Sequence, residues 1–406
     1  MKRICMVTHS FYESDNRILR YAETLAARGD EVHVIALRRS LDLKLEETIN
    51  GVRLHRIQDR LGRREASAGS FLWPLLRFTS VSSWWLARHG HARPFDVIHV
   101  HNIPDFLVFS TWYAKLRGSR VILDIHDIVP EFFGSKFGVG ADSVVVRALR
   151  LIERLSAAMA DRVILANHLW LDRYCARSAP RAKCIALINH VDEQVFHPVP
   201  LKRKSTAPTV VFPGGLQWHQ GLDIAIRAFV PLRKRLPDAR FEIYGEGGTI
   251  SSLQVLVAEL GLEDAVHFHE PVPLREIAQI MADADLGVVP KRADSFGNEA
   301  YSTKIMEFMS VGVPVVVSST KVDRHYFDDT VVRFFPSGDS ESLADAIYEL
   351  LSRPELRAEQ VARAREYAIR HSWANHKGTY LQLLDGLGCG AMSQAEAAGL
   401  GKESSR

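Results

Sequence analysis

A strand–loop–helix–strand unit late in the sequence restricts the possible fold more than any other feature. A short apolar run, Leu286–Val289, precedes a polar loop that contains glycine. An apolar helix is predicted over residues 303–311, because Ser302 suits its N-cap and Gly312 its end, and a β-branched run follows at 315–317. Apolar runs joined by a helix are typical of buried parallel strands. The sequence therefore predicts an α/β fold, in which ligands bind near the carboxyl ends of strands.

Two carboxylates accompany this unit. Glu307 lies among apolar neighbours, so its helix is expected to be buried nearly all round, where a charge needs a partner or a use. Helical side chains lean toward the N-terminus, so Glu307 should point back to the loop that carries Glu299. The helix start offers N–H groups of Thr303 and Lys304 to a phosphate. Spacing alone leaves a plainer alternative: Lys304 pairs with Glu307, and Glu299 is a solvated charge.

Length and charge limit the class of protein. A chain of 406 residues predicts two domains, and 51 basic against 48 acidic residues leave a formal charge of +3, too small to argue for nucleic acid. The 4 cysteines have no metal-ligand spacing and fit a reducing cytoplasm. The N-terminus resembles a first strand rather than a signal peptide, and no apolar run is long enough to span a bilayer.

The opening of the chain predicts a second βαβ unit. Strands are expected at Ile4–Thr8 and Glu31–Leu37, with a helix over 15–27 between them. The glycine loop of nucleotide-binding folds is absent from the first turn. We interpret Asp15 as a helix cap. Arg17 is a candidate for binding an anionic ligand on the acceptor side of the site.

Polar residues also follow two further predicted strands. His101 and Asn102 come after a strand over 95–100, and His126 comes after a strand over 120–125. Both groups should therefore face the ligand edge of the sheet. His126 is the stronger candidate, although a structural histidine remains the alternative, and we place His101 and Asn102 on the acceptor side.

The stretch 71–86 is rich in tryptophan, phenylalanine and leucine and has a single charge, Arg77. It is too short and too polar in its middle to cross a bilayer, but it suits a helix lying on a membrane surface. An ordinary core helix with a few exposed aromatics is the alternative.

The unit around Glu299 and Glu307, with its Gly-x-Pro turn and β-branched strand, resembles the donor-site signature of retaining family-four glycosyltransferases, which have the GT-B fold. The resemblance implies two Rossmann-like domains facing across a cleft. It implies that Glu299 contacts the donor sugar and Glu307 the ribose of the nucleotide. The segment around His126 is similar to the one whose histidine reaches the sugar near the reacting centre.

The glycine turns match this family less well. Gly214, Gly215 and Gly245 are candidate donor-binding residues, standing where glycines let the backbone approach a donor. The family usually carries an arginine at the position of Gly215 and a lysine at the position of Gln220, both on the diphosphate. Their absence leaves the phosphate charge to Lys304 and to Lys291 and Arg292 of the polar loop.

The resemblance covers nearly the whole chain and predicts its organisation. We expect an acceptor domain over 1–198, a nucleotide-sugar domain over 199–370 and a helix over 371–387 that returns to the first domain. Residues 388–406 are rich in small and polar residues and are expected to be disordered. The segment 198–208, rich in proline and lysine, is the expected linker.

The resemblance implies a retaining glycosyltransferase that uses a UDP- or GDP-sugar. No Asp-x-Asp motif serves this site, so we expect no metal or other cofactor. Glu299 and His126 are the catalytic candidates, and N–H groups around Gly297 and Asn298 are expected to orient the sugar. The acceptor is a glycan, a lipid-linked molecule or a small molecule of polysaccharide or glycoconjugate synthesis, reached in the cytoplasm or at the inner membrane face. A nucleotide-sugar epimerase and a non-catalytic binding protein are the alternatives.

Overall fold

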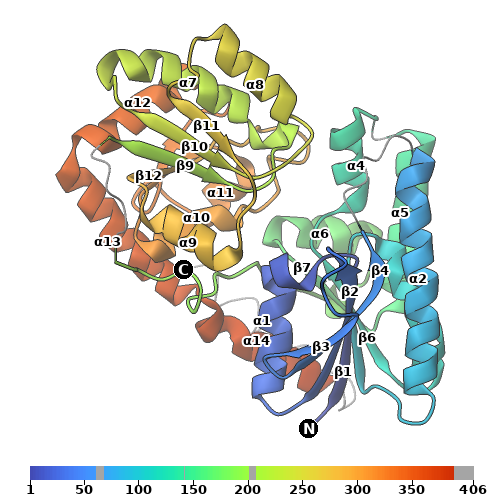
Figure 1. The fold of residues 1–406 in the computed structure, drawn as a ribbon. Coiled ribbons are helices and arrows are strands. Elements are labelled where there is room, and N and C mark those ends of the chain that lie inside the picture. The colour runs from blue at the N-terminus through green and yellow to red at the C-terminus, as the bar shows by residue number, and fades with distance from the viewer. Residues whose placement is uncertain (61–67, 141, 201–206, 388–406) are drawn as a thin grey trace. The chain divides into compact units, whose positions relative to one another are not determined.

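The chain forms two α/β units in the computed structural model, which describes residues 1–60, 68–140, 142–200 and 207–387. Unit 1 comprises Met1–Asn189 and the chain from Lys377 onward, and unit 2 comprises His190–His376 (Figure 1). The division lies after residue 189, whereas the sequence predicted a boundary after 198. The predicted disordered tail and most of the predicted linker lie outside the described residues.

Unit 1 is built on an eight-stranded sheet. All its strand pairs are parallel except β3 with β4, which form an antiparallel hairpin. The strands, in spatial order, are β3 (Glu46–Ile49), β4 (Val52–Asp59), β2 (Glu31–Arg38), β1 (Arg3–Val7), β5 (Val97–His101), β6 (Arg120–Ile125), β7 (Arg162–Leu165) and β8 (Cys184–Ala186).

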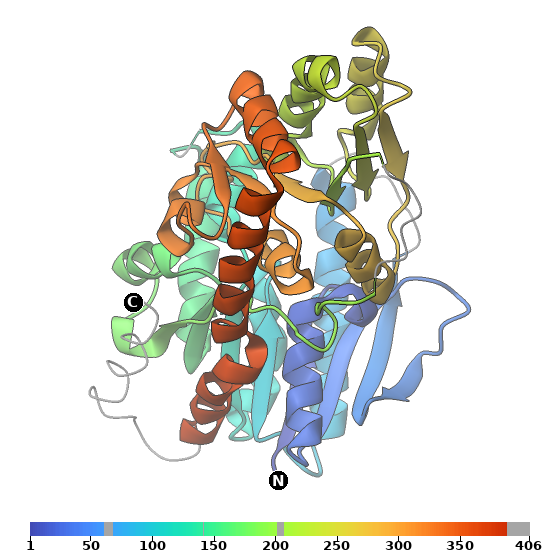
Figure 2. The same cartoon turned by 90° about the vertical axis from the view of Figure 1, so that its left-hand side faces the viewer.

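Helices cover both faces of this sheet. Asp15 is the N-cap of α1 (Asn16–Ala27) and accepts from the Ile18 N–H at 3.3 Å, as predicted. The helices are η1 (Tyr12–Ser14), α1 (Asn16–Ala27), α2 (Ala68–Gly90), η2 (Asp105–Thr111), α3 (Trp112–Leu116), α4 (Val129–Phe137), α5 (Val144–Met159), α6 (His168–Arg177), η3 (Arg181–Lys183) and α14 (Trp373–Gly386). The part of α14 that belongs to unit 1 lies next to α1 (Figure 2), where Tyr380 stacks on Tyr21 with ring centroids 4.1 Å apart.

Unit 2 has a six-stranded sheet that is parallel throughout. Its strands, in spatial order, are β11 (Val266–His269), β10 (Arg240–Tyr244), β9 (Thr209–Pro213), β12 (Leu286–Val289), β13 (Val315–Ser318) and β14 (Arg333–Phe335). Its helices are η4 (Trp218–Gln220), α7 (Leu222–Arg235), α8 (Ile250–Glu259), α9 (Leu274–Ala282), α10 (Thr303–Val311), α11 (Lys321–Tyr326), α12 (Ser340–Ser352) and α13 (Pro354–Arg370).

The predicted strand–loop–helix–strand unit is confirmed as β12, α10 and β13. Gly312 ends α10 in the left-handed conformation, with φ of 83°. Ile305 and Phe308 of α10 pack into an apolar cluster on one face of the sheet. The expectation that α10 is buried nearly all round is wrong, because Glu307 is only half-buried and shares a partly open face with Thr303.

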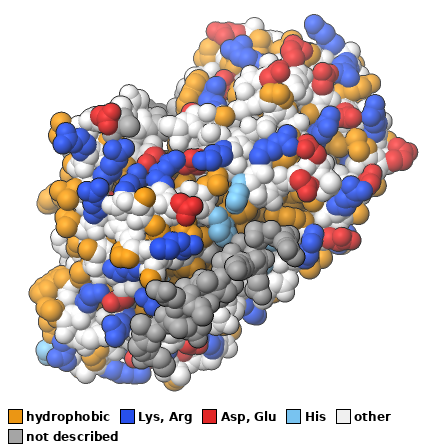
Figure 3. Space-filling view, turned by 180° about the vertical axis from the view of Figure 1, so that it is seen from behind, with side chains coloured by type: hydrophobic (Ala, Val, Ile, Leu, Met, Phe, Trp, Pro, Cys, Tyr) orange, Lys and Arg blue, Asp and Glu red, His pale blue; other side chains and the backbone are white. Residues whose placement is uncertain are grey.

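The surface agrees with the near-neutral composition. Acidic and basic side chains lie side by side on the visible face of each unit (Figure 3). Among the described helices, none has both the length and the hydrophobicity needed to cross a membrane.

Candidate functional site

The start of α10 offers polar groups that the protein itself does not use. Ser302 is the N-cap, but its side chain makes no capping hydrogen bond. The residue is 6% exposed, and its Oγ has no hydrogen-bond partner in the described part of the chain. A buried hydroxyl without a partner is costly, so it marks a position where a ligand can supply the missing bond. Together with the first N–H groups of α10, Ser302 forms a site suited to an anion.

The Lys304 amine stands next to this helix start. Its Nζ donates to Gln220 Oε1 at 3.2 Å and lies 5.0 Å from the centroid of the Phe212 ring. Burial lowers the pKa of Lys304 to about 8, while the Glu307 carboxylate opposes that shift. The site therefore holds a poorly solvated cation that an anionic ligand would stabilise.

Two of the predicted glycines lie in neighbouring turns beside the Lys304 side chain. Gly214 has φ of +125°, and a Cβ there would lie 2.6 Å from Lys304 Cε. Gly245 has φ of +148°, and a Cβ there would lie 1.9 Å from the Gly214 carbonyl oxygen. Neither position accepts a side chain in this backbone, so the two turns can lie against each other and against the lysine.

The Lys304 amine also accounts for a departure noted in the sequence. Gln220 stands where the resemblance would place a lysine, and the structure brings Lys304 Nζ to the Gln220 side chain from another element. Gly215 stands where an arginine would be, and a Cβ there would meet no atom nearer than Gln217 Cγ at 4.0 Å. A lysine amine thus lies beside residue 220 although residue 220 is not a lysine, and residue 215 has room for a side chain.

The other two cations expected at the phosphate are engaged elsewhere. Lys291 is 2% exposed, and its Nζ lies 2.9 Å from Asp323 Oδ2 and 2.6 Å from the Ala300 carbonyl oxygen. Arg292 pairs with Asp223 and stacks on Trp218, with its Cζ 3.7 Å from the ring centroid. The expectation that Lys291 meets phosphate charge is therefore wrong, because its charge is already paired inside unit 2.

Glu299 lies in the loop before α10. The residue is 7% exposed, and its Oε1 accepts from Lys321 Nζ at 3.1 Å. Lys321 is largely exposed, so this ion pair is open to solvent on one side. Glu299 is thus not the freely solvated charge of the plainer alternative.

The loop N–H groups near Glu299 are not available as expected. Gly297 N donates to Asp294 Oδ1 at 2.6 Å, and Asn298 N donates to the Asp294 carbonyl at 3.2 Å. The Asn298 side chain accepts from Lys321 N at 2.8 Å. Gly297 and Asn298 therefore shape the loop and hold it to α11, and their backbone N–H groups are used within the loop.

A second cluster lies in unit 1, at the carboxyl ends of β5 and β6. Asp124 is fully buried and accepts two hydrogen bonds from Arg17, at 2.8 Å from Nε and 2.9 Å from Nη2. The Arg17 guanidinium holds the pKa of Asp124 well below its usual range, against the effect of burial. His101 Nδ1 lies 3.0 Å from His126 Nε2, and the two nitrogens lie 3.4 and 3.6 Å from Asp124 Oδ2.

The residues assigned to the acceptor side lie in the interior of unit 1. Arg17 is 2% exposed, and His101 is fully buried. The Asn102 side chain donates to Asp105 and to the Asp127 carbonyl, both at 2.8 Å, and accepts from His126 N at 2.7 Å. These three residues support the loops at the strand ends, whereas His126 keeps a partly exposed side chain.

The sequence analysis did not identify Asp124 as a functional residue. An acid inside an apolar strand is a usable signal, because a buried carboxylate requires a cation. Its partner, Arg17, was assigned to a ligand instead. The two residues stand 107 positions apart, so spacing did not connect them.

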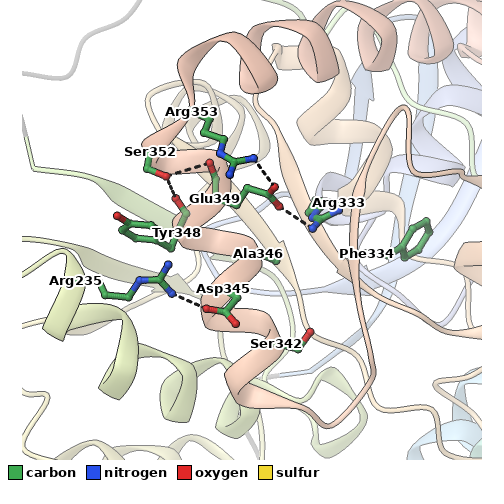
Figure 4. Close-up of a pocket in the computed structure, with 10 residues that line it drawn as sticks. All are labelled: Arg235, Arg333, Phe334, Ser342, Asp345, Ala346, Tyr348, Glu349, Ser352 and Arg353. Atoms are coloured by element: carbon green, nitrogen blue, oxygen red, sulfur yellow. Dashed lines mark hydrogen bonds and ion pairs between the residues drawn. The ribbon is translucent and has the colours of Figure 1, made fainter.

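A cavity of about 280 Å³ lies elsewhere in unit 2 (Figure 4). Its charged side chains pair with one another: Arg235 with Asp345, and both Arg333 and Arg353 with Glu349. None of the residues predicted from the sequence lines it, and the paired charges leave no evident ligand chemistry there.

Two family descriptions match the chain. Residues 14–190 match "Glycosyl transferase 4-like domain", and residues 195–367 match "Glycosyl transferases group 1". The chain is 32% identical to D-inositol 3-phosphate glycosyltransferase of Saccharomonospora viridis over 69% of this chain and 67% of that protein. It is 27% identical to GDP-mannose-dependent alpha-(1-6)-phosphatidylinositol monomannoside mannosyltransferase of Mycolicibacterium smegmatis, over 64% and 70%. Two other curated relatives are matched over only 20% and 52% of their own length.

Solved structures share the fold. Sucrose-phosphate synthase from Thermosynechococcus elongatus has a TM-score of 0.76 at 18% identity, covering 95% of this chain and 99% of that chain. Anabaena HepE in complex with UDP-glucose has a TM-score of 0.72 at 16% identity, covering 95% and 100%. At these identities the likeness concerns the arrangement of the backbone.

Proposed function

This chain belongs to the family-four glycosyltransferases of the GT-B fold, and on that premise we propose that it transfers a sugar from a nucleotide-sugar donor with retention of anomeric configuration. The observation that carries the proposal is the start of α10. There, a buried hydroxyl without a protein partner, unused helix N–H groups and a desolvated lysine lie together. This combination suits the diphosphate of a donor.

The donor is a UDP- or GDP-sugar whose diphosphate binds Ser302 Oγ, the first N–H groups of α10 and Lys304. Glu307, on the open face of α10, accepts from the ribose hydroxyls, and Glu299 accepts from the sugar. Both nucleotides occur among the matched proteins: the name of one relative specifies GDP-mannose, and one structural neighbour binds UDP-glucose.

The same groups assist the reaction. As the bond between sugar and phosphate breaks, negative charge grows on the leaving diphosphate, and the helix N-terminus and the Lys304 ammonium stabilise it. The acceptor hydroxyl attacks from the face that the phosphate leaves, and a departing phosphate oxygen takes its proton. His126, the second catalytic candidate, is a hydrogen-bond donor to the sugar in this scheme. No step in this scheme requires a metal.

The acceptor is a glycan or a lipid-linked molecule met at a membrane surface. Helices α2 and α5 of unit 1 both pack on η2. Trp112 of α3 joins them, since its Nε1 donates to Ser83 Oγ of α2 at 3.0 Å. Exposed apolar side chains on these three helices are Leu72, Trp73, Leu76, Trp84, Trp112, Leu116, Val144, Val145, Leu151 and Leu155.

The charges on these helices have one sign at the surface. Helices α2 and α3 contain no acidic residue, and the acid of α5, Glu153, is 1% exposed and pairs with Arg177. Exposed basic residues of this region are Arg77, Arg88, Arg117, Arg147 and Arg154. Aromatic and aliphatic side chains beside arginines suit a bilayer with anionic lipids.

A donor screen followed by two substitutions tests the proposal. Thermal shift against UDP-, GDP- and ADP-sugars identifies the donor, and an anomeric ¹H NMR spectrum of the product reports retention or inversion. Glu299→Ala and Glu307→Ala should each lower turnover at least ~10-fold, about 1.4 kcal/mol of transition-state binding. Glu366→Ala, on an exposed position of α13, is the matched control and should keep wild-type turnover.

Three results would contradict the proposal. Wild-type turnover in both glutamate variants removes the assigned site. Interconversion of the nucleotide sugar without acceptor indicates an epimerase. Binding of the donor without transfer to any acceptor indicates a binding protein, the alternative that the missing arginine at Gly215 keeps open.

A further inference from the structure

The buried cluster around Asp124 contains more organised hydrogen-bonding groups than an ion pair requires. Asp124 accepts two hydrogen bonds from Arg17, and three histidines lie around the same carboxylate: His99, His101 and His126. His99 and His101 are fully buried. Such networks in the interior fix the orientation of their members, because each unmade bond is costly there.

A metal ion is the first alternative to consider. Ligand atoms of His99, His101 and Asp124 all lie within 4.8 Å of one another. However, both oxygens of Asp124 already accept from the Arg17 guanidinium, whose positive charge lies where it would repel a cation. Metal-binding carboxylates and histidines are normally oriented by neutral or acidic partners rather than by an arginine. The cluster is therefore better described as a network of hydrogen bonds.

The Arg17 contact fixes the direction of those bonds. It keeps Asp124 ionised, so Asp124 only accepts. His99 Nδ1 lies 2.9 Å from the Tyr380 hydroxyl, and its Nε2 lies 3.5 Å from Asp124 Oδ2. Either the hydroxyl or His99 Nδ1 donates in the first contact, and His99 Nε2 makes no hydrogen bond with the described residues.

Between His101 Nδ1 and His126 Nε2, 3.0 Å apart, one nitrogen must donate and the other accept. The opposite nitrogen of His101, Nε2, is buried and has no hydrogen-bond partner in the described residues. A buried N–H without a partner is rarer than a buried acceptor without one. His101 therefore carries its proton on Nδ1, where it points between His126 Nε2 and the Asp124 carboxylate.

We propose that Asp124 and His101 are positioning residues that hold neutral His126 in the tautomer protonated on Nδ1. His126 Nε2 accepts from His101, so the proton of His126 lies on the other edge of the ring. His126 is the member of this pair with a partly exposed side chain, at 21%. It thereby presents an N–H donor to a ligand oxygen. That ligand contact rests on the proposed function, whereas the tautomer does not.

The test reads the tautomer directly in the full-length protein. Two-bond ¹H–¹⁵N spectra of protein labelled with ¹⁵N-histidine, recorded above the pH at which free imidazole titrates, distinguish protonated from bare ring nitrogens. His126→Gln assigns the His126 signals by their disappearance. We expect a protonated Nδ1 and a bare Nε2 for His126, and a protonated Nδ1 for His101.

Two matched variants test the cause. His101→Leu removes the donor and should shift His126 toward the form protonated on Nε2. His101→Asn keeps an N–H donor near the position of Nδ1 and should preserve the wild-type tautomer. Turnover is then measured with the donor identified by thermal shift. It should fall about 10-fold in His101→Leu and less than about 3-fold in His101→Asn. The reason is that only His101→Leu loses the hydrogen bond between the uncharged His126 ring and the ligand.

The outcomes separate this proposal from the proposed function. A proton on His126 Nε2 in the wild type, or an unchanged His126 tautomer in folded His101→Leu, overturns it. One equivalent of zinc retained by the purified protein also overturns it. If His101→Leu does not fold, the wild-type and His101→Asn spectra decide. A wild type without transferase activity defeats the proposed function and leaves the tautomer measurement valid.

Discussion

Replacing Lys304 by methionine tests the anion site most directly. Methionine keeps the length and packing of the side chain beside Phe212 but removes the charge. A unit charge 4 Å from a phosphate oxygen contributes about 4 kcal/mol at an effective dielectric constant of 20, before the cost of desolvation. A hydrogen bond to a charged group contributes about 1.5–3 kcal/mol net. Lys304→Met should therefore weaken UDP or GDP binding about 10- to 150-fold.

The pH dependence of binding gives a sharper signature. The pKa of Lys304 is lowered to about 8 in the free protein, chiefly because burial disfavours the charged amine. A bound diphosphate favours the charged form, so the pKa of this amine should rise in the complex. Below pH 8 the amine is charged in both states and affinity should be flat. Above pH 8 binding requires proton uptake, so affinity should fall, by up to about tenfold per pH unit.

Calorimetry in buffers of different ionisation enthalpy measures this uptake. Titrations with the preferred nucleoside diphosphate at pH 7 and pH 9 should show almost no proton uptake at pH 7 and up to one proton at pH 9. Lys304→Arg stays charged and should lose the pH dependence, and Lys234→Met, at an exposed position of α7, should behave as wild type. Equal affinity of wild type and Lys304→Met at pH 7 would refute the assignment.

Three further predictions concern the rest of the molecule. Gly215→Arg should tighten nucleotide binding about tenfold by calorimetry, because the position has room for a side chain and gains a charged donor; an unchanged Kd would show that the anion lies elsewhere. Arg17→Met should lower the free energy of unfolding by about 3–5 kcal/mol in urea, because it leaves the buried Asp124 carboxylate unpaired. Wild-type stability would contradict that account. Trp73→Ser combined with Trp84→Ser should reduce sedimentation with anionic vesicles at least about tenfold without changing nucleotide affinity; unaltered sedimentation would remove α2 from the membrane surface.

Local signals in the sequence predicted the strands and helices that position the site. The apolar run Leu286–Val289 and the residues Ser302 and Gly312 fixed the bounds of β12 and α10, because strand hydrophobicity and helix caps act over a few residues. Burial around α10 was less predictable, because it depends on which sides of the helix the sheet and neighbouring helices cover.

Contacts between distant segments were not predictable in this way. The sequence predicted that Arg17 would bind an anionic ligand. In the structure, Arg17 pairs with Asp124, which lies 107 positions later. Lys291 was offered as a phosphate cation, yet Asp323, in α11, holds its charge. In both cases the sequence identified a residue with unusual chemistry, and only the fold could say which partner it meets.

The loss of cations at residues 215 and 220 illustrates why a site should be judged by charge in space rather than by residue type at a position. By sequence comparison alone, the phosphate site would be classed as degenerate, because glycine and glutamine stand where the family has two basic residues. In the structure, the Lys304 amine reaches the Gln220 side chain from 84 positions away. If that amine replaces the missing lysine, Gln220→Lys should add nothing to nucleotide affinity, because the second amine would stand beside the first and repel it. Gly215→Arg and Gln220→Lys therefore form a pair with opposite expectations. A large gain from Gln220→Lys would mean that Lys304 does not occupy the anion site.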